Sequence, residues 1–227
     1  YEAFCDRAKA LFAAIPAEFT EGVEDVAIHR GVKRHPQIDD VVTLGECEPS
    51  PLVAMTDGSE VRSIVHLYYG SFVDLARSDP TFDLDDELKE TVEHEVQHHV
   101  EDKAGRRGLI DEDDLFDAHA RFLADLDVAP GWYRAGRALE RNVYAIDLDL
   151  FVEVEMRKKE FDALRGKRLT LKVLGDPVEV EIPDDAEADE VFTLAGEGLL
   201  QTAEDEDPET TTDDLPAGDL HIVPLVR

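Results

Sequence analysis

The sequence predicts an α+β protein built from two domains. Helical periodicity dominates the first part of the 227-residue chain, and strand-like alternation dominates the part after about residue 144. Hydrophobic residues make up 43% of the chain, enough to form a core, so a wholly disordered protein is excluded. A stretch containing Pro130 and Gly131 separates the two parts. We therefore expect domains at 1–126 and 144–227, joined by a linker at 127–143.

The first domain is expected to combine helices with a few strands. Residues 32–60 look loop-like, because prolines and an Asp-Gly turn signal interrupt them. Asp83 is placed to cap a long helix, and Gly105 is placed to end it. The apolar spacing predicts, in chain order, a helix at 1–15, strands at 23–29 and 61–72, and helices at 84–104 and 112–126.

The second domain reads as a series of strands separated by Gly, Pro and Asp turns, which is typical of a half-buried sheet. Residues 203–214 form an acidic low-complexity run that we expect to be a loop. The predicted elements are strands at 146–154, 169–173, 178–182, 191–194 and 220–226, and one helix at 158–164.

Charge and composition exclude several classes of function. The chain has 54 acidic and 23 basic residues, a formal net charge of −31, which repels phosphates and argues against a nucleic-acid partner. No stretch approaches the ~20 apolar residues needed to cross a bilayer, so we expect no membrane association. Cys5 and Cys47 are the only cysteines and form neither a disulfide framework nor a zinc finger. We expect a cytoplasmic protein.

The string TVEHEVQHHVED, residues 91–102, contains the pattern His94-Glu95-x-x-His98. Residues four apart lie one turn apart on a helix, so the two imidazoles can hold one metal ion. Glu95 lies about 100° around the helix, where it can serve as general base toward a water molecule. A zinc ion would lower the pKa of that water to ~7. The pattern therefore predicts a Zn²⁺ site with the chemistry of a metallopeptidase.

A catalytic zinc usually has a third protein ligand, and the sequence leaves its identity open. Acidic residues at 111–117 could fold back from the next helix. The candidates are Asp102, Glu101, Asp111 and His119.

The first 104 residues resemble the minimal zincin-like metallopeptidases, a small bacterial family. The matching pieces are ALFAAIPAEFTEGVEDVAIH (10–29), IVHLYYGSF (64–72) and ELKETVEHEVQHHVED (87–102). The resemblance implies zinc at His94 and His98, with Glu95 as general base. Family members continue with Gly three residues after the second His and an acidic residue three further on. Glu101 and Ala104 stand there instead, so the usual third ligand is missing.

Zincins place an antiparallel edge strand beside the site, where a substrate peptide adds as a further strand. The resemblance assigns that role to residues 63–72, because exposed strand edges offer main-chain hydrogen bonds to an extended peptide. His66 and Tyr68, which share one face of this strand, are the candidate substrate-contacting residues.

The C-terminal part resembles the peptide-binding β-sandwich domain of DnaJ-type co-chaperones. The matching segments are 146–173, 176–200 and 218–227, with the Gly-x-Gly-Leu turn at 196–199 as the most specific piece. His35-Pro36 is followed by Gln37, so the His-Pro-Asp motif is absent and no chaperone ATPase partner is expected. The resemblance implies an all-β module that captures unfolded segments.

These observations lead to one hypothesis and two alternatives. The hypothesis is a zinc-dependent peptidase that hydrolyses extended or unfolded polypeptide, with an appended β module that captures the substrate. The first alternative is a non-catalytic, chaperone-like protein that holds unfolded chains. The second is a protein in which the metal has a structural role.

Overall fold

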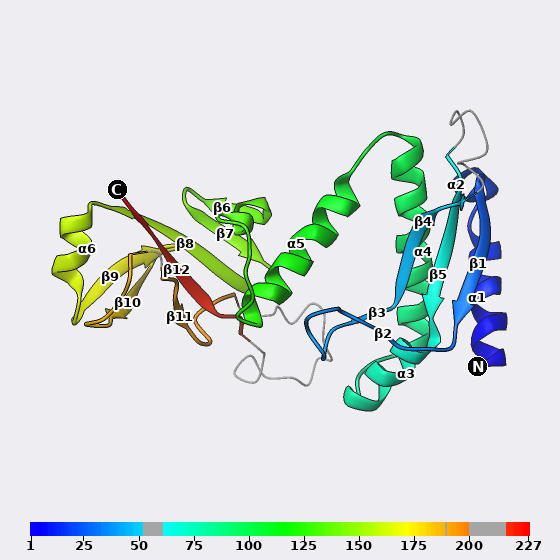
Figure 1. Cartoon of the computed structure of the whole chain (residues 1–227), viewed down its shortest axis with the longest axis horizontal. Coiled ribbons are helices and arrows are strands. Elements are labelled where there is room, and N and C mark those ends of the chain that lie inside the picture. The colour runs from blue at the N-terminus through cyan, green and yellow to red at the C-terminus, as the bar shows by residue number, and fades with distance from the viewer. Residues whose placement is uncertain (52–60, 189, 200–216) are drawn as a thin grey trace. The chain divides into compact units, whose positions relative to one another are not determined.

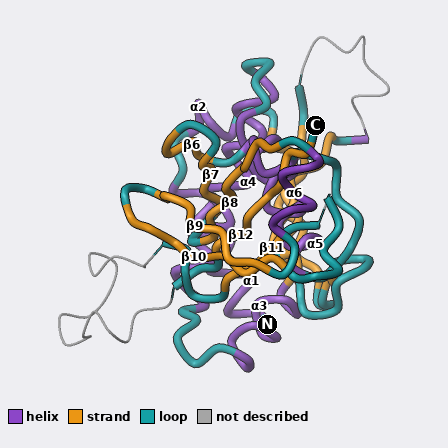
Figure 2. Tube along the Cα trace, turned by 90° about the vertical axis from the view of Figure 1, so that its left-hand side faces the viewer, coloured by secondary structure: helices purple, strands orange, loops and turns teal. Residues whose placement is uncertain are grey.

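Two units make up the fold, Tyr1–Leu126 and Asp127–Arg227. The structure is a computed structural model that describes residues 1–51, 61–188, 190–199 and 217–227. Helices and strands occur together in the described parts of both units, so the predicted α+β class is confirmed (Figure 2). Among the described helices, none combines the length and apolar character needed to cross a membrane.

The first unit begins with a helix, and its longest helix is the last but one of its elements (Figure 1). Its elements are α1 (Glu2–Ala14), α2 (Ala17–Thr20), β1 (Val23–His29), β2 (Lys33–Arg34), β3 (Val42–Thr43), β4 (Gly45–Pro49), β5 (Ser63–Tyr68), α3 (Tyr69–Ser78), α4 (Leu84–Lys103) and α5 (Gly108–Leu123).

A three-stranded sheet in the order β1-β5-β4 forms the centre of this unit, with β5 parallel to β1 and antiparallel to β4. Side chains alternate between the faces of a strand. Val65 and Leu67 of β5 are therefore buried on one face, where they join Phe4 of α1 and Val92 of α4 in the core. Figure 1 shows α4 alongside this sheet.

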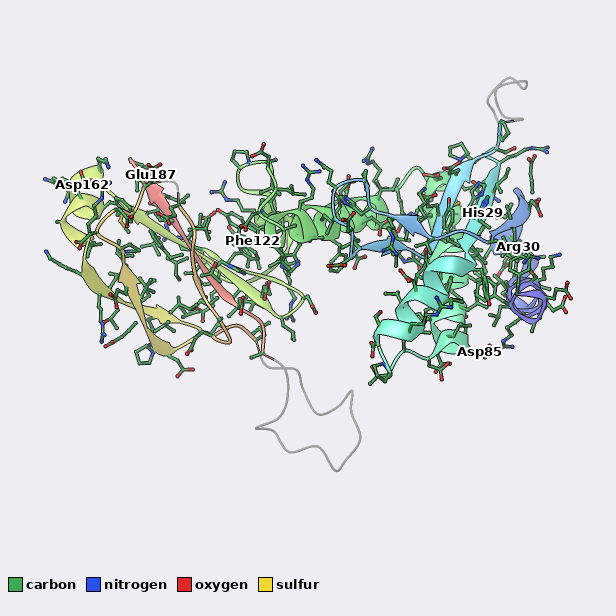
Figure 3. All side chains as sticks on the ribbon, turned by 60° about the horizontal axis from the view of Figure 1, so that its bottom comes forward. His29, Arg30, Asp85, Phe122, Asp162 and Glu187 are labelled. Carbon is green, nitrogen blue, oxygen red and sulfur yellow. The ribbon has the colours of Figure 1, made fainter. Side chains whose placement is uncertain are left out.

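Helix α4 begins where the sequence predicts. The Asp83 carboxylate accepts hydrogen bonds from the backbone N–H groups of Asp85 and Asp86, at 2.9 and 3.2 Å. At the other end Gly105 has φ +64°, a conformation that suits glycine and ends the helix. Asp85, labelled in Figure 3, also pairs with Arg7 of α1 at 2.5 Å. The start of the helix is thus fixed by its own capping residue and by an ion pair to α1, and its end by the glycine turn.

Two predicted elements of this unit are corrected by the structure. The expected strand over 61–72 ends at Tyr68, and Tyr69 begins α3 because Tyr69 and Phe72 both pack against Phe4. The expected loop over 32–60 contains β4, which exists because it pairs with β5 along its whole length. Tertiary contacts outweigh the local sequence signal in both cases.

In its described residues, the second unit contains two sheets, one short α-helix and one 3-10 helix. Its elements are η2, a 3-10 helix (Trp132–Ala135), β6 (Arg137–Glu140), β7 (Val143–Ile146), β8 (Asp149–Met156), α6 (Lys158–Leu164), β9 (Lys167–Val173), β10 (Asp176–Ile182), β11 (Phe192–Leu194) and β12 (Leu220–Val226). The larger sheet has the order β11-β12-β8-β7-β6, and β9 and β10 form a separate hairpin. The predicted bounds of α6 and β12 are confirmed.

One apolar core joins the two sheets of this unit and includes Val152 and Ile222 from the larger sheet, Val180 from the hairpin and Phe161 from α6. The predicted linker at 127–143 is wrong, because it contains η2 and β6, and β6 pairs with β7. The acidic run at 203–214 lies outside the described residues.

Candidate metal centre

Helix α4 carries the two histidines of the HExxH pattern at the border of the core. Leu88, Val92 and Val96 are buried, which fixes the rotation of the helix. His94 and His98 therefore lie at the flank of this apolar stripe, with side chains 41% and 12% exposed. Their rings meet edge to face with centroids 4.7 Å apart. The predicted one-turn pairing of the two imidazoles is present.

Three potential metal donors converge at this flank. The Nε2 atoms of His94 and His98 are 3.1 Å apart. The carboxylate of Asp113, from α5, lies 3.5 Å from His94 Nε2 and 3.0 Å from His98 Nε2. Hydrogen bonding to Asp113 raises the pKa of His94. Among the described residues, these three are the potential ligands whose donor atoms lie close enough together to hold one metal ion.

This donor set fits a tetrahedral zinc ion. Bonds of about 2.0–2.2 Å to zinc place neighbouring donors of a tetrahedron about 3.3–3.6 Å apart. The three observed separations, 3.0 to 3.5 Å, lie within a few tenths of an ångström of this range. Two imidazoles and one carboxylate leave a fourth position open, as in catalytic zinc sites. His94, His98 and Asp113 are therefore the side chains that could hold zinc.

The four candidates for a third ligand lie elsewhere. Glu101 accepts a hydrogen bond of 2.9 Å from the Leu109 N–H and so supports the start of α5. Asp102 lines the pocket beside the site without joining the three donors. Asp111 is exposed and lies 3.6 Å from Arg107, and His119 is buried on α5. The local sequence gives no signal that separates Asp113 from its acidic neighbours.

Glu95, the predicted general base, is buried beside the donors. Its residue exposure is 6%, although it is a carboxylate. Burial raises its pKa to about 7, the charge of His94 opposes this rise, and the charges of Asp113 and Glu46 add to it. A carboxyl group with a pKa in this range can both accept and release a proton near neutral pH.

A glycine allows Glu95 to occupy its place. A Cβ atom added to Gly45 of β4 would lie 2.8 Å from Glu95 Cγ, 2.8 Å from Glu95 Oε1 and 2.6 Å from Thr91 Cγ2. The backbone of β4 thus approaches α4 more closely than any side chain would permit. Gly45 could not be predicted as part of the site, because its only signal in the sequence is a glycine within the expected loop.

The pocket at the site has a volume of about 450 Å³ and lies between β4 and the two helices. Its lining residues are Thr43, Gly45, Glu46, Cys47, Glu48, His94, Glu95, His98, Asp102, Ile110 and Asp113. The strand at this pocket is β4, which lies at the edge of the sheet. The expectation that residues 63–72 form the edge strand is wrong, because β5 is paired on both sides.

His66 and Tyr68 support β4 from the neighbouring strand instead of lining the pocket. Tyr68 donates a hydrogen bond of 2.7 Å to Glu46, and His66 Nε2 lies 3.7 Å from the Glu48 carboxylate. His66 also contacts His29 at the end of β1, labelled in Figure 3, with 2.9 Å between ring nitrogens. The two predicted substrate-contacting residues, His66 and Tyr68, therefore contact the carboxylates of Glu48 and Glu46 on the edge strand.

The second histidine of the pair His98-His99 anchors α4 to the sheet. His99 is fully buried, with Nδ1 2.9 Å from Ser63 Oγ and Nε2 2.9 Å from the Glu21 carbonyl oxygen. Because the carbonyl can only accept, Nε2 carries the proton and Nδ1 accepts from the hydroxyl group. Both ring nitrogens are satisfied, so His99 holds the helix in place and does not ligate metal.

The comparisons with known proteins assign no function to this chain. Neither a protein-family model nor a curated protein matches the sequence. Among solved structures, the chain is similar to a conserved hypothetical protein from Thermo thermophilus, with 34% sequence identity and a TM-score of 0.40. The match covers 46% of this chain and 97% of that protein.

Proposed function

We propose that the first unit is a zinc-dependent peptidase that hydrolyses extended or unfolded polypeptide. The observation that carries the proposal is the convergence of His94, His98 and Asp113, with donor atoms 3.0 to 3.5 Å apart, beside the buried carboxylate of Glu95. When bound, zinc supplies Lewis acidity that brings the pKa of water to about 7 and polarises a carbonyl group.

Glu95 takes the proton of the attacking water and passes it to the leaving amine. Its carboxylate is held by the close approach of Gly45, which limits the positions it can adopt. A fixed general base contributes about 10²–10⁴-fold to such a reaction.

Strand β4 orients the substrate in this proposal. It lies at the edge of the sheet and lines the pocket that contains Glu95. An extended peptide can add to such an edge through main-chain hydrogen bonds. This mode requires an unfolded or flexible substrate, because a folded segment cannot offer its backbone to another strand.

The first experiment measures zinc content and cleavage together. The purified chain of residues 1–227, loaded with zinc, should contain one zinc ion per chain and should cleave unfolded casein, while His94→Ala should lose the zinc. Glu95→Gln should keep the zinc and the fold but lower cleavage by at least about 100-fold. Glu90→Gln, at an exposed position on the same helix, is the matched control and should cleave as the wild type does.

Two results would contradict the proposal. One is cleavage that Glu95→Gln leaves unchanged. The other is a zinc-loaded protein that cleaves no unfolded substrate but suppresses the aggregation of one, which would favour the non-catalytic binding function. The capture of substrate by the second unit stays a prediction from its resemblance to the DnaJ-type domain.

A further inference from the structure

The pocket beside the candidate metal centre is acidic on the side of the edge strand. Glu46 and Glu48 of β4 line it, and Asp102 of α4 adds a third carboxylate besides those of the site itself. No lysine or arginine lines it in the described parts of the chain. Because side chains alternate along a strand and Gly45 faces Glu95, the Glu46 and Glu48 side chains project from the other face of β4, where an added substrate strand meets their negative charge.

The two glutamates differ in how far their charge is already neutralised. Glu46 forms an ion pair with Lys33 and accepts a hydrogen bond from Tyr68. Glu48 has a side chain that is 60% exposed, and its carboxylate lies 3.7 Å from the ring of His66. Glu48 is thus the carboxylate of the strand that is available to a new partner.

The register of the strands places Glu48 at a defined distance from the general base. Gly45 lies against Glu95, and Glu48 is three residues further along β4, which is about 10 Å at 3.3–3.4 Å per residue. On an added strand, the residue directly opposite Glu48 would point its side chain to the same face as Glu48, which is the face away from Glu95, with Cβ atoms about 4.5–5.5 Å apart. An ammonium or guanidinium group on that residue can reach the carboxylate.

We infer that the substrate is an extended polypeptide with Lys or Arg opposite Glu48, about three residues from the hydrolysed bond. This inference rests on the proposed peptidase function and adds the chemical class of the substrate. Like-charged residues placed directly opposite each other destabilise strand pairing, so an acidic residue at the same position is disfavoured.

The test uses quenched fluorescent peptides that differ only at one position. Lys, Gln and Glu are placed in turn at each of the four positions on either side of the cleaved bond, and kcat/KM is measured with the zinc-loaded full chain. At one position, about three residues from the bond, Lys should exceed Gln by about fivefold and Gln should exceed Glu by a similar factor. The Lys preference should fall as the salt concentration rises.

Variants at Glu48 decide whether this side chain is responsible. Glu48→Gln should reduce the Lys-to-Glu ratio to near one, and Glu48→Lys should invert it. Glu90→Gln should keep the wild-type ratio. A ratio near one in the wild type, or one that both Glu48 variants leave unchanged while peptides are still cleaved, would overturn the inference and leave the peptidase proposal standing. If the wild type cleaves none of the peptides and no casein, the peptidase proposal itself fails.

Discussion

The contact between Gly45 and Glu95 offers a test of how the general base is positioned. Replacing Gly45 with Ala adds a methyl group 2.8 Å from Glu95 Oε1 and 2.6 Å from Thr91 Cγ2. Ordinary contacts between such atoms begin at about 3.5 Å, so the new group is about 0.7–0.9 Å too close to its neighbours. Because Glu95 is buried, its carboxylate cannot simply swing into solvent.

The expected loss follows from this displacement. A misplacement of about 1 Å at a reacting group can lower a rate by about 100-fold, equal to about 2.7 kcal/mol of transition-state stabilisation. The overpacked contact should also destabilise the fold by about 1–3 kcal/mol. Zinc content should stay at the wild-type value, since the added Cβ contacts Thr91 and Glu95 and not the three metal donors.

The assay compares kcat/KM for casein or a quenched peptide with zinc content and with urea unfolding at a temperature where all variants are folded. Gly31→Ala is the matched control, because a Cβ at Gly31 meets nothing within 4 Å. A kcat/KM of Gly45→Ala equal to that of the wild type would show that the close approach of Gly45 does not position Glu95. A folded variant that has lost its zinc would also contradict this positioning role, since the defect would then lie at the donors.

Three further predictions concern the metal, a thiol and a turn. Asp113→Asn should weaken zinc binding by at least about 100-fold in a competition titration, while Asp114→Asn should leave it unchanged; equal affinities would remove Asp113 from the site. Burial raises the pKa of the Cys47 thiol to about 11. In metal-free Cys5→Ser protein, the alkylation rate of Cys47 should therefore rise about tenfold per pH unit from pH 8 to 10. A rate that reaches a plateau near pH 8.5 would contradict this raised pKa. A Cβ at Gly218 would lie 2.2 Å from backbone atoms of Leu148, in the turn between β7 and β8, so Gly218→Ala should lower the free energy of unfolding by about 1–3 kcal/mol in urea. Unchanged stability would show that this turn can relax.

The sequence predicted the elements whose signals are local. The strand over Val23–His29 and the helix over Lys158–Leu164 have the predicted bounds, and the long helix starts at Leu84 behind its Asp83 cap. Alternation and side-chain capping act within a few residues, so they can be recognised without knowing the fold. The pairing of His94 with His98 belongs to the same class, because it depends only on one turn of helix.

The parts that the sequence did not predict depend on contacts between distant segments. Strand β4 has the sequence GECEP, which lacks apolar alternation and forms a strand through its pairing with β5. Asp113 becomes a candidate ligand through the turn between α4 and α5, which selects it from an acidic stretch whose other members have the same chemistry. The role of Gly45 appears only when α4 is packed against β4.

Anomalous diffraction at the zinc edge from a crystal of the zinc-loaded chain can show directly whether His94, His98 and Asp113 hold a zinc ion. We expect one zinc ion within about 2.2 Å of the Nε2 atoms of His94 and His98 and of one carboxylate oxygen of Asp113. A crystal soaked in zinc that shows no ion between these three side chains, or shows the two imidazoles turned apart, would contradict the account.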